Sequence, residues 1–321
     1  MTVIQAHNHL LGRVLDRRWA NGRSGLTREA FARFHAARTR TAWGGRHQQT
    51  FALVRGDEWL AAATCYQLAA VLDGAPVRVC AIGSVVTDAP DHESAHASTL
   101  VEQLLEDAAR DGADLALLFC NAASSSCDRN GFEPIPATDV ELNIAQSARH
   151  GAPMTLVRGG EDRDLAAIVA MGRARATPFR FHLDRDVDLV KYAVTTKRLL
   201  AGLGAAGARQ LHFFIAEEGI TAAAYVVISV AGNAWTLEEC GDRDVSGARV
   251  GAILQALIAR EPVERRPTIR GWLPPGFVPP QVAITSAAPS ENALMLRPLR
   301  QRAIEPVLSG DAVLYWRGDI F

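Results

Sequence analysis

The sequence predicts a mixed α+β fold that is built twice along the chain, each half with a central mixed β-sheet flanked by helices. In each half, apolar runs of strand length alternate with short turns, and an amphipathic helix and a further strand follow them. The segment Ser147–Thr155 is small and polar, contains a Gly and a Pro, and separates the two halves. We therefore expect two domains of ordinary size, at residues 1–150 and 151–321.

The first half begins with a helix and continues as an antiparallel sheet. Residues 26–40 place Leu26, Phe31 and Phe34 near one helix face and offer Thr27 as the N-terminal capping residue. Residues 50–87 contain apolar runs interrupted by the turns RGDE and DGAP, which predicts a meander of strands.

After these strands, the spacing of the apolar residues changes to that of a helix. Apolar side chains between residues 97 and 108 recur at spacings of three and four, which predicts an amphipathic helix that ends before Gly112. DLALLF, at residues 114–119, then reads as a strand buried on both faces. A further turn and strand are expected in GFEPIP and DVELNI, within residues 131–144.

The second half repeats this plan. Residues 154–176 predict a strand and a helix, residues 212–240 a strand meander, residues 250–260 an amphipathic helix, and residues 267–274 another strand. The glycines of GLGAAG, at residues 202–207, follow helical sequence and not a strand, so they end a helix and do not form a dinucleotide-binding turn.

Composition restricts the possible functions. The chain of 321 residues is 48% hydrophobic and 21% charged with a formal net charge of -1, which favours neither nucleic-acid nor membrane-surface binding. Its N-terminus does not resemble a signal peptide. Five cysteines without a CxxC pair indicate free thiols in a reducing cytoplasm, and the histidine spacing predicts no metal site.

Four stretches together carry a family resemblance. The strings AIGSVVT, ASTLVEQLL, ADLALLF and CDRNGFEPIP, in this order, resemble the central part of the GNAT N-acyltransferase superfamily. With a weaker GNAT-like second half and the ending LYWRGDIF, the chain is similar to two-domain GNAT proteins related to fungal lysine acetyltransferase and to the bacterial enhanced-intracellular-survival acetyltransferases.

The resemblance implies an acyl-CoA site in the first half. Two parallel strands, AIGSVVT and DLALLF, would separate around the pantetheine arm, and the backbone at Val85 and Val86 would hold the pantetheine and the thioester carbonyl. The turn before the helix would bind the pyrophosphate through free N–H groups and the helix dipole. The family pattern (Arg/Gln)-x-x-Gly-x-(Gly/Ala) falls on His92, Ala95 and Ala97, of which only Ala97 matches fully.

The cofactor-binding residues expected from this alignment are Val85, Val86, His92, Ser94, Ala95, His96, Ala97, Ser98, Thr99 and Ala123. Glu93 adds a carboxylate beside the expected phosphates, which is unfavourable unless it points to solvent. The alternative interpretation of the turn is an ordinary capped helix without a ligand.

Two residues are expected near the chemistry. Cys127 occupies the position at which the family has a tyrosine that protonates the departing thiolate. A cysteine there is a proton donor, an acyl-accepting nucleophile, or a small buried residue. The resemblance to the enhanced-intracellular-survival proteins implies that the carboxylate of the last residue, Phe321, reaches back as a base for the amine. A frayed terminus is the alternative.

The second half lacks a complete cofactor turn. Gly251 fits its last position, but Arg249 stands where a glycine is expected, so this half is expected to shape the acceptor pocket and support the first. Trp43 and Glu217 are the candidate acceptor contacts. The alternative for Trp43 is packing in the core, and the alternative for Glu217 is a solvated position in a pair of acidic residues at the surface.

Together these features predict an N-acyltransferase that moves an acetyl or other acyl group from acyl-CoA to a primary amine of a small molecule or to lysine. The alternatives are a non-catalytic acyl-CoA-binding or regulatory protein and a structural pseudoenzyme that binds no CoA. The sequence identifies neither the acceptor nor the oligomeric state.

Overall fold

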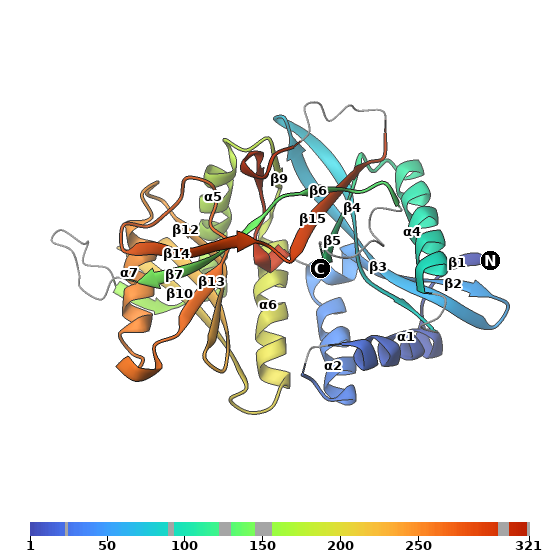
Figure 1. Cartoon of the computed structure of the whole chain (residues 1–321), viewed down its shortest axis with the longest axis horizontal. Helices are drawn as coiled ribbons and strands as arrows, with labels where there is room; N and C mark the ends of the chain where they lie inside the picture. The colour runs from blue at the N-terminus through green and yellow to red at the C-terminus, as the bar shows by residue number, and fades with distance from the viewer. Residues whose placement is uncertain (23–24, 89–92, 122–129, 145–155, 301–307, 320–321) are drawn as a thin grey trace.

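Two β-sheets with helices between and around them make up the computed structural model (Figure 1), which describes residues 1–22, 25–88, 93–121, 130–144, 156–300 and 308–319. Within these ranges, one sheet has nine strands and the other has seven. This confirms the mixed α/β fold class that the sequence predicts. No helix in the described ranges is long and apolar enough to span a membrane.

The first sheet has the order β1-β2-β3-β4-β5-β15-β6. Its meander agrees with the predicted one: β2, β3 and β4 are antiparallel neighbours, and the DGAP turn between β3 and β4 has Asp73 and Gly74 at positive φ. β5 then pairs in parallel with β4, as the continuous apolar run predicts. The bounds are β1 (Thr2–Gln5), β2 (Gln48–Arg55), β3 (Glu58–Leu72), β4 (Ala75–Thr87) and β5 (Leu115–Asn121).

Helices cover both faces of this sheet. α4 (Glu93–Arg110) buries Leu100, Leu104 and Leu105 against one face, which confirms the predicted apolar stripe. α1 (Asn8–Asn21), α2 (Arg28–Thr39) and α3 (Ala42–His47) lie away from α4, across the sheet (Figure 1). The Thr27 side chain accepts a hydrogen bond from the backbone N–H of Ala30 at 3.2 Å, so Thr27 caps α2 as predicted.

The second sheet repeats the arrangement, with the order β14-β7-β13-β12-β11-β10-β8. Its parallel pair, β12 and β13, is joined through α7, just as β4 and β5 are joined through α4. The elements are β8 (Leu156–Gly159), α5 (Leu165–Ala176), α6 (Val187–Leu203), β10 (Arg209–Glu218), β11 (Thr221–Ala231), β12 (Ala234–Asp242), α7 (Ala248–Ile258) and β13 (Thr268–Gly271).

Four strands connect the sheets. β6 (Glu133–Ile135) belongs to the first sheet and β7 (Thr138–Ile144) to the second, while β14 (Val282–Pro289) belongs to the second and β15 (Asn292–Pro298) to the first. Since β6 pairs with β15 and β7 with β14, the two stretches form one long antiparallel ribbon that crosses between the sheets (Figure 1). The sheets therefore interlock across the predicted division near residue 150.

Helix α6 is a second connection, standing between the sheets in Figure 1. Its Leu189 and Tyr192 pack into the core of the first sheet, whereas Val190 and Val194 pack into a core of the second. After it, the C-terminal strand β16 (Val313–Leu314) pairs with β9 (Phe181–Leu183), which itself pairs with β3. Short 3₁₀ turns complete the described elements: η3 (Asp162–Asp164), η4 (Val263–Arg265), η5 (Gly310–Ala312) and η6 (Arg317–Asp319).

Candidate functional site

The parallel strands β4 and β5 pair over only part of their lengths. Their register runs from Val79–Leu115 to Ile82–Leu118, whereas β4 continues to Thr87 and β5 to Asn121. Beyond Ile82 and Leu118, the described backbone groups of the two strands are no longer paired with one another. On the β4 side, such groups need other hydrogen-bond partners, and an extended ligand is able to supply them.

A bulge in β4 coincides with this separation. The β3–β4 register shifts between Ala62 and Thr64, and Ser84 on the bulged strand has φ +53. Val85 directly after it is 40% exposed, while the Val86 side chain packs against the apolar cluster beneath α1. The structure thus places both predicted backbone-binding residues where β4 turns away from β5.

The first turn of α4 follows this strand end. α4 begins at Glu93, so Ser94, Ala95 and His96 lie in its first turn, where backbone N–H groups have no partner within the helix. Ala95 and Thr99 are exposed, and the three residues between them are partly buried. The Thr99 hydroxyl donates to the Ala95 carbonyl at 2.9 Å and is therefore already used within the helix.

Four predicted residues, His92, Ala123, Cys127 and Phe321, lie outside the described residues. Their assigned roles remain predictions from the sequence.

An ion pair fixes the outer side of α4 to the ribbon. Arg297 on β15 donates to both carboxylate oxygens of Glu102, at 2.7 and 2.9 Å, and to the carbonyl of Asn130 at 2.6 Å. Gly131 follows at φ +67, and Phe132 is buried under α4. The GFEPIP segment therefore holds α4 in place.

Trp43 is a core residue. Its side chain is 4% exposed and packs against the rings of Tyr192, His47 and Tyr66, at centroid distances of 4.6, 5.1 and 6.4 Å. This is the packing that the sequence left open as an alternative to substrate contact.

Glu217 lies apart from the other predicted residues. Arg158 donates from Nε to its Oε2 at 2.9 Å, and this hydrogen bond holds the pKa of the carboxyl below its ordinary value. Glu217 belongs to β10 of the second sheet, next to the edge strand β8, and α6 stands between β10 and the strands β4 and β5 in Figure 1. The structure therefore does not bring Glu217 together with the cofactor-binding residues.

A group of basic residues under α1 and α2 was not predicted. Arg18 is only 7% exposed, and it lies with His35 and Arg38 beside the Tyr66 and Tyr192 rings. Burial lowers the pKa of Arg18 to about 10. Burial, together with the nearby positive charges of Arg18 and Arg38, lowers the pKa of His35 to about 4, so this imidazole is neutral at pH 7.

A sequence signal for this group does exist. Arg18 follows buried Val14 by four positions, and Arg38 follows buried Phe34 by four, so each arginine continues the apolar face of its helix.

The C-terminal segment reaches the first sheet. The Tyr315 ring contacts Phe119 of β5 at a centroid distance of 5.6 Å and Trp272 at 4.4 Å. Phe119 is the residue directly after the last β4–β5 pair. The chain therefore returns to the point at which the parallel strands separate.

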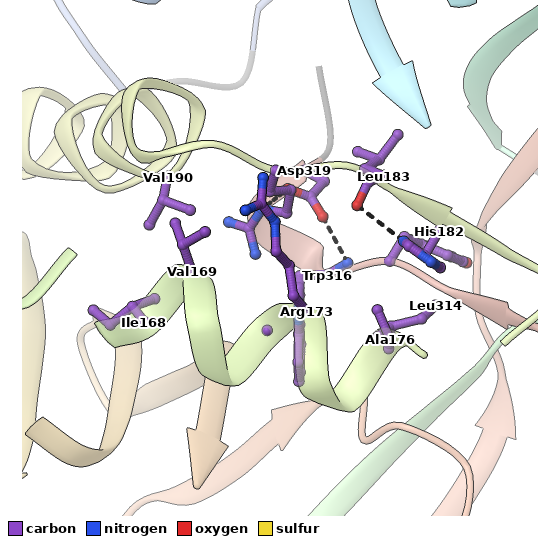
Figure 2. A pocket seen from close by; sticks show the side chains of 13 residues that line it. Ile168, Val169, Arg173, Ala176, His182, Leu183, Val190, Leu314, Trp316 and Asp319 are labelled. Atoms are coloured by element: carbon purple, nitrogen blue, oxygen red, sulfur yellow. Dashed lines mark hydrogen bonds and ion pairs between the residues drawn. The ribbon is translucent and has the colours of Figure 1, made fainter. Parts of the chain in front are cut away.

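Buried charges anchor the end of this segment. Arg185 donates to both carboxylate oxygens of Glu239, at 2.7 and 2.8 Å, and its Nε lies 3.4 Å from Asp319 Oδ1. The backbone N–H of Trp316 also donates to Asp319, at 3.0 Å (Figure 2). A cavity of about 30 Å³ remains between these groups and α5. Asp319, two positions before the last residue, is thus held inside the protein.

The equivalent turn in the second half is filled by the protein itself. Asp242, at the end of β12, accepts hydrogen bonds from the Arg249 backbone N–H at 2.9 Å and from its guanidinium at 3.0 Å. A Cβ at Gly251 would lie 1.8 Å from Gln281 Oε1, so the Gln281 side chain occupies the space beside that glycine. At α7 an internal carboxylate stands where a phosphate would bind.

Neither a known family nor a curated protein matches the sequence. Solved structures do match the fold. One is a GCN5-related N-acetyltransferase from Anabaena variabilis, with 10% identity, TM-score 0.66, and coverage of 93% of this chain and 73% of that one. Eis1 from Mycobacterium abscessus matches with 15% identity, TM-score 0.59 and coverage of 93% and 74%. Saccharomyces cerevisiae N-myristoyltransferase with bound myristoyl-CoA matches with 9% identity, TM-score 0.53 and coverage of 92% and 81%. The chain thus has the fold of GCN5-related N-acetyltransferases, as the sequence resemblance predicts.

Proposed function

We propose that this protein is an N-acyltransferase that binds acetyl-CoA or another acyl-CoA in its first half and transfers the acyl group to a primary amine. The observation that carries the proposal is the separation of β4 from β5 beyond Ile82 and Leu118, with the bulge at Ser84 and the first turn of α4 beside it. The fold of the acyltransferases described above supports the same assignment.

The proposed reaction is direct transfer. The amine nitrogen attacks the thioester carbonyl carbon, the C–N bond forms, the C–S bond breaks, and CoA leaves as a thiolate that takes up a proton. The backbone N–H groups at Val85 and Val86 stabilise the developing oxyanion, so the protein acts mainly by alignment and electrostatics. We assign proton donation to the thiol of Cys127 and deprotonation of the amine to the carboxylate of Phe321. Cys120 in β5 is disulfide-bonded, so the predicted free thiol is wrong at that position, and this assignment applies to the reduced protein.

The second half has a supporting role in this proposal. With Asp242 and Gln281 filling the turn before α7, this half has no place for a second pyrophosphate. Its contribution is to hold the C-terminal segment through Arg185 and Glu239. We therefore propose one acyl-CoA per chain.

Incubation with acetyl-CoA and a panel of primary amines tests the proposal. Release of free thiol together with an acylated amine, identified by mass, is the expected result. Cys127→Ala is expected to lower the rate by about tenfold or less, because the departing thiolate can take up its proton from water instead. An acyl adduct on Cys127 in the intact mass would instead show a covalent intermediate. Binding of acetyl-CoA without turnover on any amine would indicate the non-catalytic alternative.

A further inference from the structure

We propose that Arg18 and Arg38, between α1, α2 and the first sheet, bind an anionic group of the acceptor. The acceptor is then an amine that also carries a carboxylate or a phosphate group. The statement that the bound anionic group belongs to the acceptor rests on the proposed function. The anion site itself rests on the charges and contacts described below.

No described residue supplies a counter-ion to either of the two guanidinium groups. Within the part of the chain that the structure describes, Arg18 Nε and Nη2, Arg38 Nε and His35 Nε2 are buried without a hydrogen-bond partner. The groups around Arg18 are Tyr66 and the positively charged Arg38, and those around Arg38 are the hydroxyls of Tyr66 and Tyr192. An unpaired buried charge is costly, and the usual compensation is an ion of opposite sign.

Three other partly buried arginines of the chain are paired with carboxylates. Arg158 bonds to Asp164 and Glu217, Arg185 lies between Glu239 and Asp319, and Arg249 contacts Asp242 and Glu218. Each of these three guanidiniums has two carboxylates, whereas Arg18 is at least as buried and has none among the described residues. Since no described residue supplies a carboxylate to Arg18, we assign the missing anion to a ligand.

The surroundings orient the guanidiniums for such a ligand. Arg38 lies 5.3 Å from the ring centroids of both Phe34 and Tyr192, and its Nη2 donates to the Tyr192 hydroxyl. The Tyr192 hydroxyl in turn donates to Gln48 Oε1 at 2.8 Å. With its Nη2 held in this way, Arg38 still has Nε free, and Arg18 has both Nε and Nη2. Planar guanidinium N–H groups match carboxylate and phosphate oxygens.

The position of the site fits an acceptor. Tyr66 on β3 pairs with Ala81 of β4, next to Ile82, where the β4–β5 pairing ends. Arg17, the neighbour of Arg18, donates from Nε to the carbonyl of Thr87 at the end of β4, at 2.9 Å. The basic group therefore lies across the sheet from α4, beside the strand end that would hold the thioester. Arg38 and His35 are partly exposed, so the site is not sealed from solvent.

Anion binding tests this site without any need for acyl transfer. The thermal midpoint of the full-length protein is measured in inorganic phosphate and in glutarate, each against sodium chloride of the same ionic strength. We expect one or both anions to raise the midpoint above the chloride value, because a ligand of the native state stabilises it. The two arms distinguish phosphate from carboxylate recognition. No increment from either anion would overturn the proposal.

Variants localise the effect. Arg18→Gln and, as a second variant, Arg38→Gln are expected to raise the apparent dissociation constant of the effective anion at least about tenfold, since charge-assisted hydrogen bonds are lost. Arg33→Gln, on the exposed face of the same α2 helix, is the matched control and should bind as the wild type does. An unchanged dissociation constant in either folded Arg18 or Arg38 variant would contradict the assignment.

Matched acceptors connect the site to catalysis. 4-Aminobutyrate against butylamine, and phosphoethanolamine against ethanolamine, differ only in the acidic group. If acyl transfer occurs, the acidic member of at least one pair should have the higher kcat/KM, and Arg18→Gln should remove that preference. Anion binding without transfer to any amine would refute the proposed function but support the anion site. Transfer without preference for an acidic acceptor would refute the acceptor assignment.

Discussion

The imidazole of His35 lies beside two guanidinium groups, and this makes the free energy of unfolding depend on pH in a measurable way. Its pKa is about 4 in the folded protein, against an ordinary value of about 6.5. Between these pH values the unfolded chain binds more protons, so stability is fully present above pH ~6.5 and is lost as the pH falls toward 4. At pH 5 this histidine should cost up to about 2 kcal/mol relative to neutral pH.

His35→Gln should therefore lose less stability between pH 7 and pH 5 than the wild type does, in chemical denaturation in a buffer of monovalent chloride. His9→Gln, at an exposed position, is the control and should follow the wild type. A parallel decline in wild type and His35→Gln would mean that His35 has the same pKa in the native and unfolded states and would contradict this account.

At the scale of single residues, the sequence predicts local features well. Thr27 caps α2, and Gly112 has φ +93 two positions after the last residue of α4, as expected of a capping residue and of a glycine that ends a helix. Arg18 and Arg38 were missed, although both continue an apolar helix face, because charged side chains are seldom buried and the three basic residues come from two helices. Their proximity is a tertiary property.

At the scale of elements, the two strand–helix–strand units β4-α4-β5 and β12-α7-β13 have the same topology but different helix N-termini. The α4 turn has exposed Ala95, whereas the α7 turn holds the buried carboxylate of Asp242. The alternation of apolar runs and helix periodicity predicts both units. The sequence does not predict that Asp242 and Gln281 fill the turn before α7, because only the folded sheet brings these two residues next to α7.

Asp242→Ala is expected to lower the free energy of unfolding by about 3 kcal/mol, because it leaves Arg249 without its buried partner and removes a cap from α7. The stoichiometry of acetyl-CoA binding should remain one per chain. Denaturant unfolding and calorimetric titration measure the two quantities. A variant of unchanged stability would contradict the structural role given to Asp242. Binding of a second acetyl-CoA would show that Asp242 alone, and not Gln281 as well, keeps a phosphate out of this turn.

At the scale of the whole molecule, the crossing ribbon makes each sheet depend on both halves of the chain. β15 from the second half pairs with both β5 and β6, and β7 from the first half lies between β13 and β14. Sequence patterns predict β5, β7 and β13 but neither β14 and β15 nor the pairing between the two halves, since strand pairing over more than 120 residues leaves no local signal.

A fragment of residues 1–150 should therefore lack cooperative unfolding and should expose the edge of β5 that β15 covers in the intact chain. Circular dichroism melting of the fragment and of the full-length protein makes the comparison. The full-length chain is expected to unfold in a single transition, because α6 and the ribbon join both cores. A fragment that melts cooperatively and binds acetyl-CoA would show that the first half is independent.

The central claim, that the first turn of α4 and the separated strands bind acyl-CoA, is tested most directly by calorimetric titration of acetyl-CoA into three proteins: wild type, Ala95→Asp and Ala95→Ser. We predict one site per chain in the wild type and nearly unchanged affinity in Ala95→Ser. Ala95→Asp should bind more weakly by at least tenfold, because a carboxylate about 4 Å from a phosphate charge costs roughly 1 kcal/mol in water and about 4 kcal/mol at an effective dielectric constant of 20. No binding heat in the wild type, or equal affinity in a folded Ala95→Asp variant, would contradict the account.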